Sequence, residues 1–192
     1  MTNSPASSSI ILMGMKHSGK STHGARLSRL LECDFADLDE IAERAYDPRR
    51  SKSCREIYAQ HGKEFFTELE TRAANELAER LLRARMVAAL GGGTVENEAA
   101  MELLRGRGVM VYLADSEERL FARIMETGTP AFLPPDDPRG GFSRLFARRS
   151  EAYARYAEVV IDIVGKEVEE AFAGLLSGLA ESGYIEGIDA RQ

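Results

Sequence analysis

Gly14-Met15-Lys16-His17-Ser18-Gly19-Lys20-Ser21 is the stretch of this sequence that decides the fold. It fits the pattern G-x-x-x-x-G-K-[ST] at every fixed position. The apolar run 10–13 precedes it, and leucines at helical spacing follow it. A strand, a glycine-rich loop and a helix in that order let backbone N–H groups wrap the phosphates of a nucleotide. The sequence therefore predicts a phosphate-binding loop.

The residues of this loop have separate expected roles. Lys20 reaches the β- and γ-phosphates and is a predicted catalytic residue, and the Ser21 hydroxyl is a predicted ligand of Mg²⁺. His17 is interpreted as a solvent-facing side chain and not as a base. The predicted ATP-binding residues of the loop are Gly14, Lys16, His17, Ser18, Gly19, Lys20, Ser21 and Thr22.

Short apolar runs recur along the chain, separated by longer segments with helical spacing. They cover residues 10–13, 86–90, 109–113 and 159–164, with a weaker run at 34–37. Strands that alternate with helices predict an α/β fold, a three-layer α/β/α sandwich around a parallel sheet, as in P-loop NTPases. We expect one domain over residues 1–192.

Two smaller regions are expected to stand out from the sandwich. A helical substrate-binding region is predicted at about residues 39–70. The proline-rich and glycine-rich segment at about 128–141 is predicted to be a lid, with a plain surface loop as the alternative. The tail over residues 183–192 is expected to be disordered.

The composition restricts the partners of the protein. A net charge of -6 disfavours a nucleic-acid surface, which needs clustered Lys and Arg. The only two cysteines, Cys33 and Cys54, are expected to be reduced thiols, as in the cytosol. No apolar run approaches the length of a membrane span or signal peptide. We expect a cytoplasmic protein that binds neither nucleic acid nor membrane, and a monomer, although the sequence leaves the oligomeric state open.

Five motifs, in family order, make the chain resemble the shikimate kinases over about residues 10–164. The first is the phosphate-binding loop, and each of the others is similar to a family segment. They are Phe35-Ala36-Asp37-Leu38-Asp39-Glu40 (D-x-D), Gly62-Lys63-Glu64-Phe65-Phe66-Thr67-Glu68-Leu69-Glu70 (G-E-x-x-F-R-x-x-E), Leu90-Gly91-Gly92-Gly93 (triple glycine) and Arg149-Ser150-Glu151-Ala152-Tyr153 (R-x-x-x-Y).

The resemblance implies roles for two aspartates. Asp37 would help to hold the magnesium, and Asp39 would contact the acceptor hydroxyl and act as its base. Asp37 and Asp39 alternate along a strand end, so their side chains are expected to point to different sides. A solvated helix start is the alternative for this pair.

Further site residues follow from the resemblance. Arg123 would pack on the adenine, with a surface salt bridge as the alternative. Arg149 would fork two hydrogen bonds onto a carboxylate, with a solvated basic face alongside Arg144 and Arg148 as the alternative. Glycines let backbone amides approach a ligand. The predicted substrate-binding residues are Lys16, Asp39, Thr67, Glu70, Gly91, Gly92, Gly93 and Arg149.

Departures from the family pattern bear on the substrate. Thr67 stands where the family has an arginine that grips the acceptor carboxylate, and no basic residue occurs over 125–138, where the lid arginine is expected. Lys16 is a candidate replacement cation. Glu70 keeps its position without that arginine, and a buried carboxylate needs a partner. An ammonium group on the substrate would supply one.

These observations predict an ATP-dependent kinase that uses Mg²⁺ and phosphorylates a hydroxy acid or hydroxy amino acid of amino-acid biosynthesis. Homoserine is favoured, giving O-phosphohomoserine. The alternative acceptors are shikimate, giving shikimate 3-phosphate, gluconate, and a nucleoside monophosphate, which Thr67 disfavours. A different class, a nucleotide-binding protein without catalysis, is supported by the missing lid arginine. Arg139 and Arg144 are candidates to replace that arginine when the lid closes.

Overall fold

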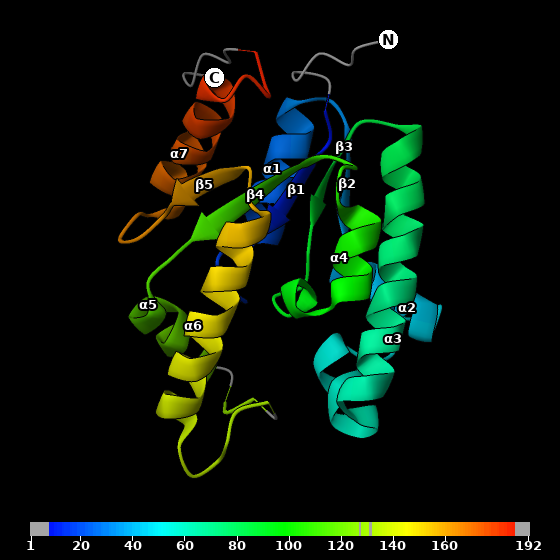
Figure 1. The fold of residues 1–192 in the computed structure, drawn as a ribbon, viewed down its shortest axis with the longest axis vertical. Helices are drawn as coiled ribbons and strands as arrows, with labels where there is room; N and C mark the ends of the chain where they lie inside the picture. The colour runs from blue at the N-terminus through cyan, green and yellow to red at the C-terminus, as the bar shows by residue number, and fades with distance from the viewer. Residues whose placement is uncertain (1–7, 127, 131, 187–192) are drawn as a thin grey trace.

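The computed structural model describes residues 8–126, 128–130 and 132–186 (Figure 1). Strands and helices alternate along the chain. The strands are β1 (Ile10–Met13), β2 (Asp34–Asp37), β3 (Met86–Ala89), β4 (Val109–Ala114) and β5 (Val159–Asp162). The helices are α1 (Lys20–Leu30), α2 (Leu38–Tyr46), α3 (Cys54–Arg83), α4 (Glu98–Leu104), α5 (Glu117–Glu126), α6 (Pro138–Tyr156) and α7 (Val168–Glu181), with a 3₁₀ turn, η2 (Thr94–Glu96).

The strands form a parallel sheet in the order β2-β3-β1-β4-β5. β1 lies at its centre, where Leu12 is opposite Ala89 on one side and Val111 on the other. Its four residues are all apolar and buried, as expected for a parallel strand covered on both faces. The weaker run at 34–37 is also a strand. The predicted fold class is confirmed.

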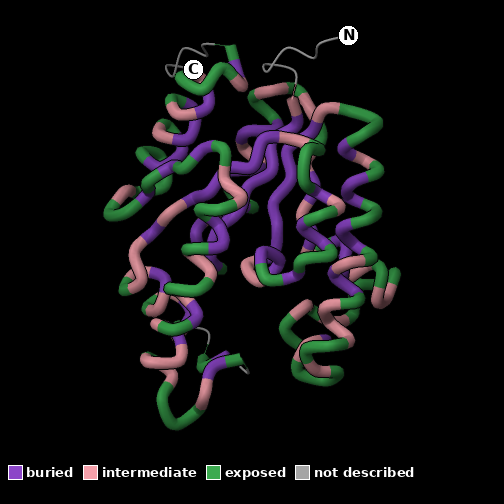
Figure 2. The backbone as a smooth tube through the Cα atoms, viewed as in Figure 1, coloured by how far each residue is buried: buried purple, intermediate pink, exposed green. Residues whose placement is uncertain are grey.

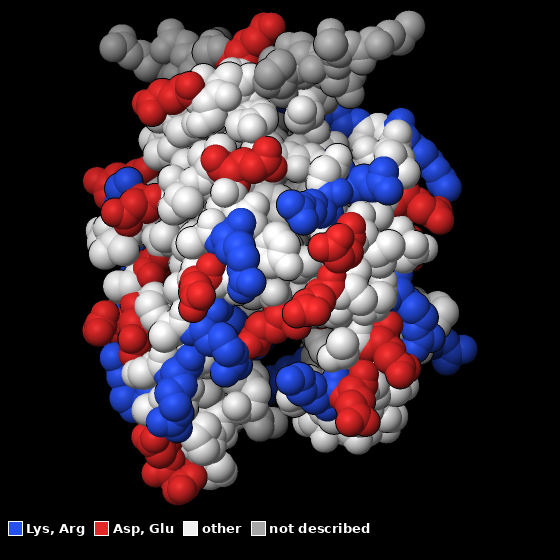
Figure 3. All heavy atoms as spheres, in the orientation of Figure 1, with Lys and Arg blue, Asp and Glu red and all other residues white. Residues whose placement is uncertain are grey.

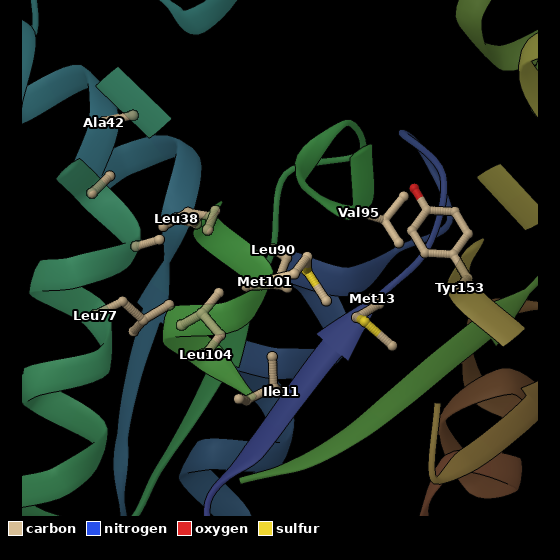
Figure 4. Packing of buried hydrophobic residues seen from close by; sticks show 14 of the residues in the cluster. Ile11, Met13, Leu38, Ala42, Leu77, Leu90, Val95, Met101, Leu104 and Tyr153 are labelled. Carbon is tan, nitrogen blue, oxygen red and sulfur yellow. The ribbon is translucent and has the colours of Figure 1, made fainter. Parts of the chain in front are cut away.

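Each face of the sheet has its own core, because successive side chains of a strand point to opposite faces. Ile10 and Leu12 pack in a cluster with side chains of α1 and α7. Ile11 and Met13 pack in the other cluster, with side chains of α3, α4 and α6 (Figure 4). Figure 2 shows the buried chain concentrated along the sheet and more exposed chain in the parts that project from it.

Two projections extend beyond the carboxyl ends of the strands (Figure 1). One is α2 with the first part of α3, which starts with a capping box between Ser53 and Glu56 and breaks at Gly62, whose φ is 80°. The other runs from α5 to the start of α6. Since parallel strands end at one edge of the sheet, ligands are expected between these projections.

Two boundaries differ from the sequence predictions. The predicted lid over 128–141 ends earlier, because α6 starts at Pro138, where Asp137 accepts a hydrogen bond from the Gly140 N–H at 2.9 Å. Residue 131 lies outside the described residues. The predicted disordered tail is wrong for its first part, since Ile185 is buried in the core. Residues 187–192 lie outside the described part of the chain.

Over the same described ranges, none of the helices combines the length and apolar character that crossing a membrane requires. Cys33 and Cys54 are both free thiols.

Candidate active site

The phosphate-binding loop connects β1 to α1 and depends on unusual backbone angles. Gly14 has a φ of 149°, and a Cβ there would lie 2.8 Å from the Leu113 carbonyl oxygen. Gly19 has a φ of 86° and precedes α1 without a side-chain cap. The first N–H groups of a helix have no partner within it and carry its positive dipole end. The N-terminus of α1 is therefore ready to bind an anion.

Lys20 is held over this loop by its own backbone. The Nζ donates to the carbonyl oxygens of Gly14, at 2.9 Å, and Met15, at 2.8 Å. Burial lowers the pKa of Lys20 to about 8, although the nearby carboxylates of Asp39 and Asp37 favour its charged form. The ammonium group is thus fixed in position before any ligand binds.

Three side chains suit ATP and a metal ion. The Ser18 hydroxyl is buried without a hydrogen-bond partner among the described residues, which a phosphate oxygen would satisfy. Ser21 Oγ donates to Asp37 Oδ2 at 2.5 Å. Hydroxyl and carboxylate oxygens are ligands that Mg²⁺ prefers, and it usually takes one or two carboxylates together with substrate phosphates. In the described chain no group of three or more His, Cys, Asp or Glu could hold a metal alone.

Asp37 and Asp39 face different groups, as expected, but through a different local geometry from the one that the sequence predicted. Alternation along a strand end is wrong, because β2 ends at Asp37 and Asp39 lies in the first turn of α2. Asp37 caps that helix, accepting from the Asp39 N–H at 2.9 Å, and its other oxygen faces Ser21. Burial, and then the charge of Asp37, raise the pKa of Asp39 to about 6.

The triple glycine after β3 makes room for three different partners. A Cβ on Gly91 would lie 2.5 Å from Asp39 Oδ1, and one on Gly92 would lie 2.8 Å from the Lys16 backbone nitrogen. A Cβ on Gly93 would lie 3.3 Å from Arg149 Nη2. Lack of space requires glycine at position 92, where the neighbour is backbone, and a side chain at position 91 or 93 would displace Asp39 or crowd Arg149.

Glu70 is buried and has two hydrogen-bond donors. Thr94 Oγ1 donates to Oε1 at 2.7 Å, and Asn97 Nδ2 donates to Oε2 at 2.9 Å. The pKa of Glu70 is raised by burial, which these two donors oppose. The expectation that Glu70 needs a cation is wrong. Sequence reasoning missed both donors, although Asn97 stands before an apolar helix as an N-cap, so its position was recognisable.

Arg149 belongs to the site and not to a solvated face. Its side chain is 14% exposed, against 63% for Arg148. Glu96, also missed from the sequence, accepts from Arg149 Nε at 2.6 Å, and the Gly92 carbonyl oxygen accepts from Arg149 Nη1 at 2.9 Å. Tyr153, which packs beside Val95 (Figure 4), donates to the same carbonyl at 2.6 Å. Two of the three guanidinium nitrogens of Arg149 are thereby fixed.

Arg123 lies on α5 beside the phosphate-binding loop. Its Nη1 donates to the His17 carbonyl oxygen at 2.9 Å and lies 3.8 Å from the buried carboxylate of Asp115. The predicted alternative, a salt bridge, is therefore present, together with a contact to the loop. Burial, and then the charge of Lys16, lower the pKa of His17. Thr22 is exposed in the first turn of α1.

A cavity of about 300 Å³ lies between the two projections, and Figure 3 shows the surface hollowed there. All eight predicted substrate residues line it, together with His17. They are Lys16, Asp39, Thr67, Glu70, Gly91, Gly92, Gly93 and Arg149. The lining also includes residues that the sequence did not single out, namely Arg55, Lys63, Phe66, Glu96, Asn97 and Arg148.

Neither Arg139 nor Arg144, the two candidates for the lid arginine, reaches the cavity in this conformation. Arg139 pairs with Glu117 at 3.0 Å, and Arg144 lies 3.3 Å from Asp137. Neither arginine lines the cavity. Both candidates are therefore held in ion pairs outside the cavity.

Comparisons with known proteins agree with one another. A family model described as shikimate kinase matches residues 16–180. A shikimate kinase of Corynebacterium jeikeium is 32% identical over 89% of this chain and 88% of its own. One of Caldanaerobacter subterraneus is 34% identical, covering 84% and 90%. A solved shikimate kinase of Acinetobacter baumannii in complex with shikimate has a TM-score of 0.79 at 26% identity, covering 93% and 96%.

These findings overturn the expected acceptor. Homoserine was inferred from an unpaired Glu70, yet Thr94 and Asn97 occupy both carboxylate oxygens. The similar proteins are shikimate kinases, and the solved relative holds shikimate. The prediction of homoserine as the main acceptor is therefore wrong.

Proposed function

Because the chain belongs to the shikimate kinase family, and is thus an ATP-dependent kinase that phosphorylates a hydroxyl of a small molecule, we propose that its acceptor is shikimate and its product shikimate 3-phosphate. The observation that carries the proposal is that Asp39 and Arg149 line one cavity beside the phosphate-binding loop. Asp39 suits a hydroxyl and Arg149 suits a carboxylate, and shikimate carries both groups.

Asp39 supplies the base for the acceptor hydroxyl. With a pKa of about 6 it is mostly ionised at neutral pH, yet basic enough to accept a proton. Lys20 and the N-terminus of α1 stabilise the negative charge of the transferring phosphoryl group. Both are fixed by the fold, so no reorganisation is needed during the reaction.

Ser21 and Asp37 would hold Mg²⁺, which neutralises charge on the β- and γ-phosphates of bound ATP. Arg123 remains the proposed contact of the adenine. The cytoplasmic location and the monomeric state stay predictions.

Arg149 would bind the carboxylate, at the end of the acceptor away from the reacting hydroxyl. Glu96 and the Gly92 carbonyl fix its Nε and Nη1, and its Nη2 lies against Gly93. A guanidinium held in this way loses little freedom when it binds a carboxylate.

The test is an ADP-release assay with ATP, Mg²⁺ and shikimate, gluconate or a nucleoside monophosphate supplied one at a time. The proposal expects turnover with shikimate and a product heavier by one phosphoryl group. The Lys20→Met variant is the control for contaminating kinases. ADP release that does not depend on shikimate, or that is faster with another acceptor, would refute the proposal.

A further inference from the structure

We propose that Lys63 binds the acceptor carboxylate in place of the arginine that Thr67 replaces, so that the cation has moved by one helical turn along α3. This inference rests on the proposed function. Lys63 and Thr67 are separated by four residues and therefore lie on one face of the helix. Both line the cavity.

Thr67 offers no charge and no free hydroxyl proton. Its Oγ1 donates to the Lys63 carbonyl oxygen at 2.9 Å. The sequence G-K-E-F-F-T has a lysine where the pattern G-E-x-x-F-R has its glutamate and a threonine where that pattern has its arginine. Relative to that pattern, position 67 lacks its positive charge, and position 63 carries a positive charge in place of a negative one.

Lys63 also occupies an unusual place in α3. Gly62 has a φ of 80° and interrupts the helix, so Lys63 starts its second segment. A helix N-terminus favours a bound anion and disfavours a lysine that has none nearby. No ion pair of Lys63 is found among the described residues, and the cavity that Lys63 lines has room for an anion.

Several other charged groups of the cavity have partners of their own or lie elsewhere in it. Arg148 and Arg149 both donate to Glu96, and Glu70 accepts from Thr94 and Asn97. Lys16 lies near the reacting end, because its charge acts on both Lys20 and Asp39. Arg55, the other cation of α3 that lines the cavity, lies in the first turn of the helix and donates to the Thr129 carbonyl oxygen at 3.4 Å. Lys63, one turn from Thr67, is therefore the α3 cation that we place in a carboxylate site with the Nη2 group of Arg149.

The test compares shikimate with its uncharged carboxamide in the wild type and in Lys63→Met. The lost charged hydrogen bond should raise the KM for shikimate by about 10- to 100-fold, while kcat and the KM for ATP stay unchanged. The KM for the carboxamide should hardly change, because it has no charge to lose. Lys63→Arg should keep most of the affinity. Lys52→Met, which removes a lysine outside the cavity, is the matched control.

A second variant separates this role from a structural one. Thr67→Arg added to Lys63→Met should lower the KM for shikimate again, because it restores the cation one turn further along. Equal effects of Lys63→Met on shikimate and on the carboxamide would overturn the inference while leaving the proposed function intact. Absence of shikimate turnover in the wild type would overturn both.

Discussion

The two ends of the cavity differ in how their charges are held. At the phosphate end, the contacts come mainly from the backbone: two carbonyl oxygens fix Lys20, and α1 presents the N–H groups of its N-terminus. At the acceptor end, side chains take a larger share: Glu96 holds Arg149 together with the Gly92 carbonyl oxygen, and Thr94 and Asn97 hold Glu70.

This difference explains which end tolerates substitution. Phosphate binding by backbone N–H groups requires one conformation of the glycine-rich loop. The sequence therefore keeps every fixed position of the loop pattern. A carboxylate needs only positive charge within reach, which several positions on α3 and α6 can supply. The acceptor end can therefore lose the arginine at position 67 without a change of reaction type.

The largest effect is expected at the phosphate end. Lys20→Met should lower kcat by about 10³-fold or more, because a fixed charge on the transferring phosphoryl group is lost. The melting temperature and circular dichroism spectrum should stay close to those of the wild type. Near-normal turnover in this variant would mean that the loop does not carry the reaction.

Asp39→Asn should lower kcat by about 10²- to 10³-fold, since a general base is removed. ATP affinity, measured by calorimetry, should hardly change, because Asp37 and Ser21 remain as the proposed metal ligands. A comparable loss of ATP binding would assign Asp39 to the metal and shift the boundary between the two ends.

The pH dependence should report both ends in one profile. Asp39 must be ionised and Lys20 protonated, so kcat/KM should fall below pH about 6 and again above pH about 8. On each limb of the profile, kcat/KM should change by about tenfold per pH unit. Asp39→Asn should remove the acid limb and keep the alkaline one. A wild-type profile that is flat between pH 5 and 7, roughly one unit either side of the Asp39 pKa, would contradict the assigned base.

Glu70→Gln should have the smallest effect. The amide can accept from only one of Thr94 and Asn97, so the free energy of unfolding should drop by about 1–3 kcal/mol. Chemical denaturation measures this, with the exposed Glu68→Gln as the matched control. A rise in the KM for shikimate without any loss of stability would instead place Glu70 in contact with the substrate.

Sequence patterns predicted the parts of the molecule that obey local rules. The strands and the phosphate-binding loop followed from periodicity or from fixed spacing, and the triple glycine followed from the resemblance to the family. The geometry that separates Asp37 from Asp39 did not, because it depends on where β2 ends and α2 begins. Neither did the partners of Glu70, which come from residues 24 and 27 positions further along the chain. Such contacts form only when η2 and α4 pack against α3.

The central claim, that the rearranged acceptor end still selects shikimate, is tested most directly by competition. Shikimate, gluconate and homoserine are mixed at equal concentration with limiting ATP and Mg²⁺, and the products are identified by ³¹P NMR and mass spectrometry. We predict shikimate 3-phosphate as the dominant phosphorylated product. Another phosphorylated product in excess would contradict the account, because it would show that the changes around position 67 altered the acceptor.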